Sequence, residues 1–267
     1  MSRFKQLTIV MLMCAMFGFA PAVFAAQDDP QDQDPPIDLA TLRASLLEIG
    51  QDEQATQDLA AELVELPLVS TNLPAGFVEA EHVDPTQPLP PETTRGQQGV
   101  LSFEELGALP EIKANVAFTV SGDPAVLGGD GSTNSLTYVI FDPMELADDA
   151  ITGDTLDQIE EGIEEAFDAT TTGGVKLVSI AEIDDDDDQT LLETLNGRLV
   201  TYTLADGTTN AAAQLYIVPI ENVFVFSLVT IAANGPLNQD DVVAPAENLT
   251  MSGIEHLEDA VSTLRIR

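Results

Sequence analysis

The sequence predicts an α+β fold: a mostly antiparallel sheet with helices packed on its faces, preceded by a helical hairpin. Three observations support this prediction. Strand-like stretches outnumber helical ones, several of them are close enough to be joined as hairpins, and the helical stretches stand far apart in the chain. A regular alternation of strands and helices, which a Rossmann-type fold requires, is not present.

Two helices are expected ahead of the sheet, over residues 37–50 and Asp52–Leu66. In both stretches apolar residues recur at spacings of three and four, which is the pattern of one helix face. The residues are Leu39, Leu42, Leu46 and Ile49 in the first stretch, and Ala55, Leu59, Leu63 and Leu66 in the second. Two further helices are expected over Thr155–Asp168 and Gly253–Leu264 by the same criterion.

Alternating or continuous apolar runs predict eight strands. They cover Phe77–Val83, Gly99–Phe103, Ile112–Val120, Leu136–Phe141, Val175–Ile183, Arg198–Leu204, Ala212–Ile220 and Asn222–Ile231. The polar, Gly-rich stretch from Gly122 to Ser135 is expected to be a connection. Glu221-Asn222 is short enough for a hairpin turn. The last strand is apolar on both sides, so we expect it to be central and covered on both faces.

The first 25 residues have the layout of a secretory signal peptide. Arg3 and Lys5 precede an uncharged stretch, and small residues stand three and one positions before a cleavage point after Ala25. An uncleaved anchor would need a longer apolar run, and a lipidated Cys14 would need a smaller residue before it. We therefore expect export to a periplasm or to the extracellular space, with no membrane span after cleavage. An acidic disordered tail over 26–36, a helical segment over 37–67 and an α+β domain over 68–267 would follow.

The composition is strongly acidic. The chain has 46 Asp and Glu against nine Lys and Arg, for a formal charge of −37. This excess argues against nucleic acid as a partner, because phosphate backbones are bound by clustered basic residues. Mutual repulsion of the acids is weakest where salt screens it. The composition thus favours a halotolerant protein in saline or cation-rich surroundings. A single Cys excludes an intrachain disulfide framework.

The sequence favours a protein that is not an enzyme. A general base near neutral pH is most often His, and the chain has only His82 and His256. Neither lies in a recognisable catalytic motif, and His256 is expected to be solvated among acids on the outer face of the last helix. A carboxylate-dependent hydrolase is an alternative, although so many acids make any neighbouring pair uninformative.

Five consecutive aspartates form the sharpest local feature, and they are the candidate metal ligands. Asp184, Asp185, Asp186, Asp187 and Asp188 could bind Ca²⁺ weakly, since this ion prefers oxygen ligands. An EF-hand would need Gly at the sixth position and Glu at the twelfth, where this chain has Gln189 and Leu195. A solvated loop is the other interpretation, and no other cofactor is expected.

Several blocks of the sequence resemble the C-terminal half of PsbP-like domains. The resemblance rests on Gly197-Arg198 with Tyr202, on the apolar hairpin Leu215–Ile231 and on the closing helix that ends Val261-Ser262-Thr263-Leu264-Arg265, and it covers residues 73–267. The opening Leu73-Pro74-Ala75-Gly76-Phe77 is similar to the start of exported bacterial domains of uncharacterised function. The resemblance implies an α-β-α sandwich used for binding or assembly, without a catalytic centre. Its photosynthetic members dock on photosystem II through a Lys-rich surface that this chain lacks.

Together these observations predict an exported, non-enzymatic binding or assembly module. Its partner would be an envelope or extracellular protein whose identity the sequence does not give.

Overall fold

The computed structural model of the protein describes residues 39–69, 72–83, 112–127, 131–141, 176–184, 196–203, 207–237 and 240–266. Within these ranges, seven strands form one sheet in the order β1-β2-β3-β7-β6-β5-β4. Every pair of neighbouring strands is antiparallel. The predicted α+β class is therefore confirmed. The signal peptide, the acidic tail, the predicted strand over 99–103 and the predicted helix over 155–168 lie outside the described residues.

The strands follow the predicted apolar runs closely, with one correction. They are β1 (Phe77–Val83), β2 (Ile112–Gly122), β3 (Gly131–Phe141), β4 (Lys176–Asp184), β5 (Asn196–Thr203), β6 (Asn210–Ile220) and β7 (Val223–Ala233). The expected connection from Gly122 to Ser135 was wrong in its last part, because β3 already begins at Gly131. The ladder to β7 holds residues 131–135 in the sheet, and a second ladder to β2 includes Asn134 and Ser135.

The β6–β7 hairpin is confirmed. Ile220 pairs with Val223, and Glu221 adopts a positive φ of 52° in the tight turn between them. β7 is also central, with β3 on one side and β6 on the other. Its successive residues Phe224 and Val225 point to opposite faces, and both are buried. Both faces of the sheet are therefore buried at this strand.

In the described part of the chain, four helices accompany the sheet: α2 (Leu39–Gly50), α3 (Glu53–Glu65), α5 (Pro124–Leu127) and α7 (Asp240–Ile266). The last helix was predicted to begin at Gly253, and it begins 13 residues earlier. Pro245 and Gly253 both lie inside it. These residues usually weaken a helix, but α7 is held by packing along its length, which outweighs local propensity.

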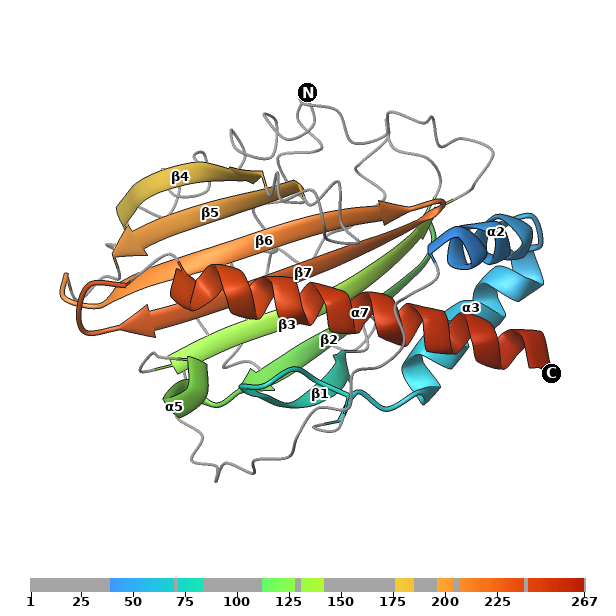
Figure 1. Ribbon diagram of the computed structural model, residues 1–267, viewed down its shortest axis with the longest axis horizontal. Coiled ribbons are helices and arrows are strands. Elements are labelled where there is room, and N and C mark those ends of the chain that lie inside the picture. Colours follow the sequence, from blue (N-terminus) through green and yellow to red (C-terminus); the bar gives the residue numbers. More distant parts are fainter. Residues whose placement is uncertain are drawn as a thin grey trace.

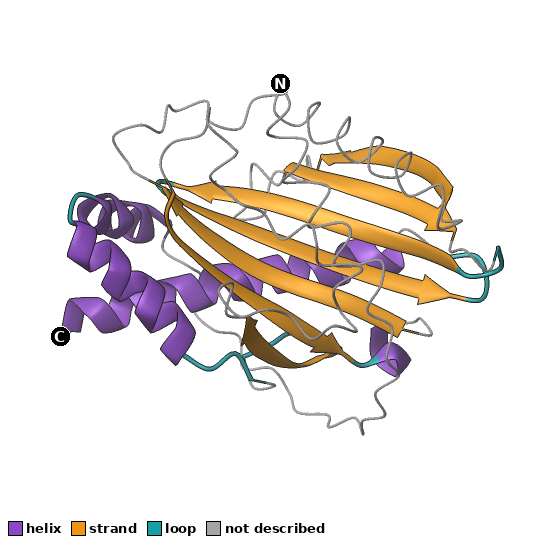
Figure 2. Cartoon of the chain, turned by 180° about the vertical axis from the view of Figure 1, so that it is seen from behind, coloured by secondary structure: helices purple, strands orange, loops and turns teal. Residues whose placement is uncertain are grey.

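Helix α7 crosses one face of the sheet, and α2 and α3 lie beside its C-terminal half (Figure 1). Seen from behind, α7 passes on the far side of the strands (Figure 2). Asp52 separates α2 from α3 and caps α3, since its side chain accepts a hydrogen bond from the Ala55 backbone N–H at 3.0 Å. The leucines of both short helices join α7 and the sheet in one core: Leu42, Leu46, Leu59 and Leu63.

Candidate functional site

Helix α7 is fixed to the sheet by a row of hydroxyl groups, one from each strand that it crosses. Tyr216 on β6 donates to Glu247 at 3.2 Å, and Ser227 on β7 is hydrogen-bonded to Thr250. Tyr138 on β3 reaches the Gly253 carbonyl oxygen at 2.9 Å. Apolar packing alone would allow the helix to slide along the sheet. The hydroxyl row gives it a single register.

The last member of this row corrects the prediction for His256. The imidazole is 3% exposed and lies under α7, not on its outer face. Its Nδ1 is 2.9 Å from the Tyr138 hydroxyl, and its Nε2 is 3.2 Å from the Leu66 carbonyl oxygen at the end of α3. His256 therefore links three elements that are distant in sequence: α7, β3 and the segment after α3.

The hydrogens available to Tyr138 and His256 are too few for all three contacts when the imidazole is neutral. If Nε2–H donates to the Leu66 carbonyl oxygen, the Tyr138 hydroxyl donates to Nδ1, and the Gly253 carbonyl oxygen does not receive the hydroxyl hydrogen. If Nδ1–H donates to the Tyr138 hydroxyl, the hydroxyl donates to the Gly253 carbonyl oxygen. The unprotonated Nε2 then faces the Leu66 carbonyl oxygen, and no hydrogen bond forms between them. Only the imidazolium satisfies every contact. The network thus has two neutral arrangements that exchange by moving two protons.

Burial decides the charge of this pair. It lowers the pKa of His256 below the ordinary value of 6.5, while the Leu66 carbonyl and Asp259 act in the opposite direction. Burial also raises the pKa of Tyr138 well above 10.0. Both groups are neutral at pH 7, and with Tyr138 0% exposed neither faces solvent in the way a substrate site requires. The role of the pair is structural, because its hydrogen bonds join α7, β3 and the segment after α3.

The other histidine lies close to this pair. His82 on β1 contacts the ring of Phe118 edge-on, with centroids 5.8 Å apart, and Phe118 makes a similar contact with His256 at 5.8 Å. Phe118 therefore separates the two imidazoles. His82 is half-buried and sits on an aromatic surface, which explains its place at the end of a strand without a chemical role.

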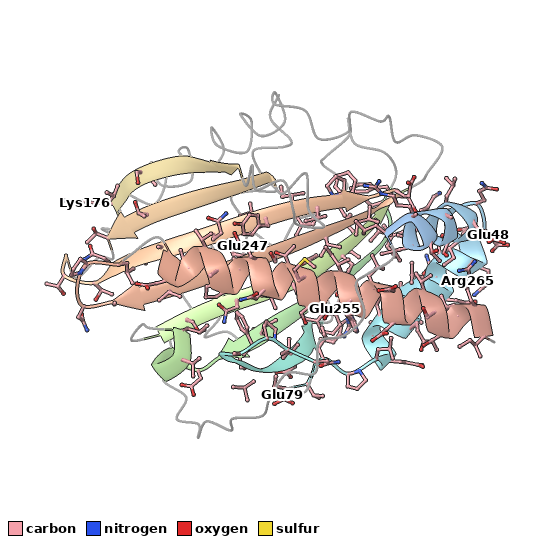
Figure 3. All side chains as sticks on the ribbon, in the orientation of Figure 1. Glu48, Glu79, Lys176, Glu247, Glu255 and Arg265 are labelled. Carbon is pink, nitrogen blue, oxygen red and sulfur yellow. The ribbon has the colours of Figure 1, made fainter. Side chains whose placement is uncertain are left out.

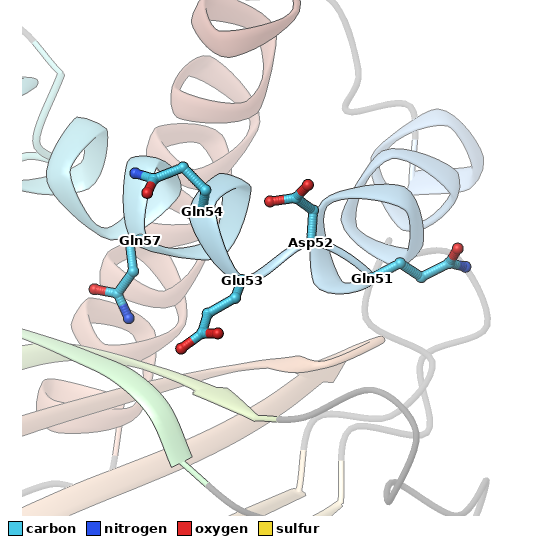
Figure 4. Close-up of a pocket in the computed structure, with 5 residues that line it drawn as sticks. All are labelled: Gln51, Asp52, Glu53, Gln54 and Gln57. Carbon is cyan, nitrogen blue, oxygen red and sulfur yellow. The ribbon is translucent and has the colours of Figure 1, made fainter.

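A polar hollow of about 500 Å³ lies where α2 meets α3. Its lining consists of Gln51, Asp52, Glu53, Gln54 and Gln57 (Figure 4), whose side chains spread outward around the junction. Asp52 already caps α3, and Gln57 donates to the Lys113 carbonyl oxygen at 3.0 Å. The hollow is wide open and has no apolar wall, so it does not resemble a small-molecule site.

The predicted metal ligands are only partly described. Asp184 is the last residue of β4, where its backbone pairs with Asn196 of β5. Asp185, Asp186, Asp187 and Asp188 lie outside the described residues. Across the described ranges, no group of three or more His, Cys, Asp or Glu side chains could hold a metal ion. Weak Ca²⁺ binding by this run therefore stays a prediction.

The two outer strands of the described sheet differ in what lies beside them. Beside β1, the Ala80 N–H donates to the Leu68 carbonyl oxygen at 3.0 Å, and Val69 forms a bridge with Glu79. The middle of β1 is thus covered. On the opposite side of the sheet, β5 is the one neighbour that β4 has among the described strands.

Strand β4 begins with a β-bulge at an exposed apolar residue. Leu177 pairs with Tyr202 and Ser179 with Thr201, so Val178 is the extra residue. The hydroxyls of Ser179 and Thr201 are 2.6 Å apart and fix this register. Val178 is 66% exposed, and Lys176 beside it is exposed at the tip of the strand (Figure 3). Sequence reasoning did not find this edge, because strand order depends on long-range pairing.

No family model and no curated protein matches this chain. The resemblance to PsbP-like domains consequently stays a prediction. None of the helices in the described part of the chain is long and apolar enough to cross a membrane.

The acidic side chains give a prediction about salt. Exposed Glu48, Glu79 and Glu255 project from three separate regions of the surface (Figure 3), and Glu255 lies one turn before Asp259, which is a repulsive spacing. Salt screens many such repulsive interactions between acidic side chains. The melting temperature should therefore rise by roughly 4–8 °C between low salt and 1 M NaCl, which is equivalent to about 2 kcal/mol in the free energy of unfolding. A thermal scan across NaCl concentrations measures this. A rise produced by millimolar Ca²⁺ and not by NaCl would contradict screening and indicate a bound metal.

Proposed function

We propose that the protein is an exported, strongly acidic, non-enzymatic binding or assembly module of the cell envelope or extracellular space. In this proposal it recruits another protein through the side of β4 that has no strand beside it among the described residues. The signal-peptide layout supports export, and the formal charge of −37 fits a surface that remains soluble in salt. Tyr and His are residue types that enzymes often use for catalysis. The burial of Tyr138 and His256 supports a structural role for this pair.

The observation that carries the proposal is the position of β4 at the end of the strand order, with β5 as its one neighbour among the described strands. An outer strand presents unpaired backbone N–H and C=O groups, and another chain can add to it as a further strand. Val178 offers an apolar side chain at 66% exposure beside that edge. The contrast with β1, whose middle is covered by Leu68 and Val69, makes β4 the better binding surface.

Site-specific photo-cross-linking in the source envelope tests this proposal. A photoreactive amino acid at position 178 is expected to give a discrete adduct with a partner protein. Val126 provides the matched control, because it is also an exposed valine, at 51%, but lies on the short helix α5. Equal adducts from both positions, or none from position 178, would contradict binding at β4.

A further inference from the structure

A short strap runs from the end of α3 towards β1 and lies along the outer side of β1. The structure describes it as Leu66–Val69 and Asn72–Leu73. We propose that this strap is a latch: it opens as a unit while the sheet stays folded, and helix α7 holds it closed. The closed strap shields the middle of β1 against pairing with another chain, as proteins commonly shield their outer strands. The inference concerns the other end of the strand order from β4 and does not rest on the proposed function.

The strap contacts the backbone of β1 over a short stretch. The Ala80 N–H donates to the Leu68 carbonyl oxygen at 3.0 Å, and Val69 forms an antiparallel bridge with Glu79. On its other side, β1 is paired with β2 from end to end. Separation of the strap therefore breaks fewer hydrogen bonds than separation of β1 from β2. Segments held in this way open locally in native proteins.

Asn72 gives the strap hydrogen bonds of its own. Its side-chain Oδ1 accepts from the Val69 N–H at 2.7 Å, and its Nδ2 donates to the Pro67 carbonyl oxygen at 2.9 Å. Its backbone N–H donates to the Val69 carbonyl oxygen at 2.9 Å. These bonds lie within the strap, so they do not have to break when the strap leaves β1. We therefore expect the strap to open as one unit.

Two residues one turn apart on α7 hold the strap closed. The Ser252 hydroxyl donates to the Asn72 carbonyl oxygen at 2.6 Å, and His256 Nε2 lies 3.2 Å from the Leu66 carbonyl oxygen. The two contacts thus hold opposite ends of the strap. Leu68, which is 2% exposed, adds an apolar contact with the core. Opening has to break all three contacts, which keeps the closed state dominant.

The segments on either side of the strap are held independently of it. Before the strap, Leu59 and Leu63 anchor α3 in the core. After it, the Asp123 N–H donates to the Gly76 carbonyl oxygen at 2.8 Å, and Gly76 adopts a φ of 95° that favours glycine. The strap can therefore open between these two points without displacing α3 or β1.

Hydrogen exchange of the folded full chain tests the latch. The Ala80 amide is expected to exchange at least roughly a hundredfold faster than the Val225 amide in central β7, because it needs only the strap to open. Ser252→Ala should speed exchange at both amides about tenfold, since its hydrogen bond is lost in local and in global opening. Thr250→Val is the matched control on α7, because Thr250 bonds to Ser227 and not to the strap. It should speed exchange at Val225 and leave Ala80 unchanged.

A disulfide between the strap and β1 gives a second measurement. Val69 and Glu79 are both exposed, and residues paired in this way have Cα atoms about 4.5–5.5 Å apart, which a disulfide can span. In a Cys14→Ser background, oxidised Val69→Cys/Glu79→Cys is expected to slow exchange at Ala80 to within about threefold of Val225. Reduction should restore the faster exchange.

Equal acceleration of Ala80 and Val225 by Thr250→Val would overturn the inference, because β1 would then be uncovered only by global unfolding. It would also be overturned if Ser252→Ala left Ala80 unchanged, or if the disulfide did not slow its exchange. In both cases the Ala80 amide would exchange without movement of the strap.

Discussion

Replacing Tyr138 by Phe is expected to lower the free energy of unfolding by about 2 kcal/mol, because the change leaves a buried imidazole nitrogen without its partner. The Tyr138 hydroxyl is 2.9 Å from His256 Nδ1 and from the Gly253 carbonyl oxygen. Water cannot easily replace it, since His256 is 3% exposed. Chemical denaturation of wild type and variant at pH 7.5 measures the difference.

Tyr216→Phe is the matched control. Both tyrosines are 0% exposed and both hydroxyls contact α7. The Tyr216 hydroxyl, however, reaches a half-buried carboxylate, Glu247, at 3.2 Å, and solvent can compensate part of its loss. We expect its cost to be near 1 kcal/mol. Equal costs for the two substitutions would contradict a special role for the His256 contact.

The same pair makes stability depend on pH. The pKa of His256 is lowered in the folded state, so on acidification the unfolded chain takes up a proton at its ordinary value of 6.5 before the folded chain does. Stability is therefore fully present above pH 6.5 and decreases as the pH falls towards the lowered pKa. His256→Asn is expected to reduce this slope between pH 7.5 and 5.5. An unchanged slope would mean that the histidine is not neutral in the fold.

Local pattern predicted most elements but not their partners. Apolar residues alternate along β2 and occupy both faces of β7. These patterns reflect burial at the strand itself, and both strands were predicted from sequence. The first residues of β3 were missed, because Ser132–Ser135 have no apolar pattern. They are strand through their pairing with β7, and β2 pairs only with Asn134 and Ser135 among them. The order that leaves β4 at an edge depends on pairing between β3 and β7, about 90 residues apart, which no local pattern encodes.

The position of His256 was missed for a related reason. The predicted helix face was drawn through Ile254, Leu257 and Val261, which places His256 outside it. In the structure a wider arc of α7 is buried and includes Gly253 and Ala260, which lie three residues before and four after His256. Two small residues at these spacings indicate close approach to a neighbour. This was the signal in the sequence that could have identified the buried histidine.

At Gly253 the close approach of α7 to the sheet leaves little space for a side chain. A Cβ atom built on it would lie 2.6 Å from Leu136 Cδ1 and 3.3 Å from Val225 Cγ1, although the residue is in the middle of a helix. Gly253→Val is expected to lower the free energy of unfolding by about 3 kcal/mol, because crowding of the core outweighs the small gain in helix propensity. Gly253→Ala should be close to neutral, since only the end of the Leu136 side chain must move and the gain in propensity is about 1 kcal/mol.

The Leu136→Ala background separates this crowding from any other defect. Leu136 is fully buried, so the truncation alone should cost about 3 kcal/mol and leave space facing Gly253. In that background Gly253→Val would occupy the space, and its cost should fall to about 1 kcal/mol or less. The two substitutions are thus expected to be strongly non-additive, as residues in direct contact are. Additive costs in a denaturation cycle of the four proteins would mean that α7 does not approach β3 at Gly253.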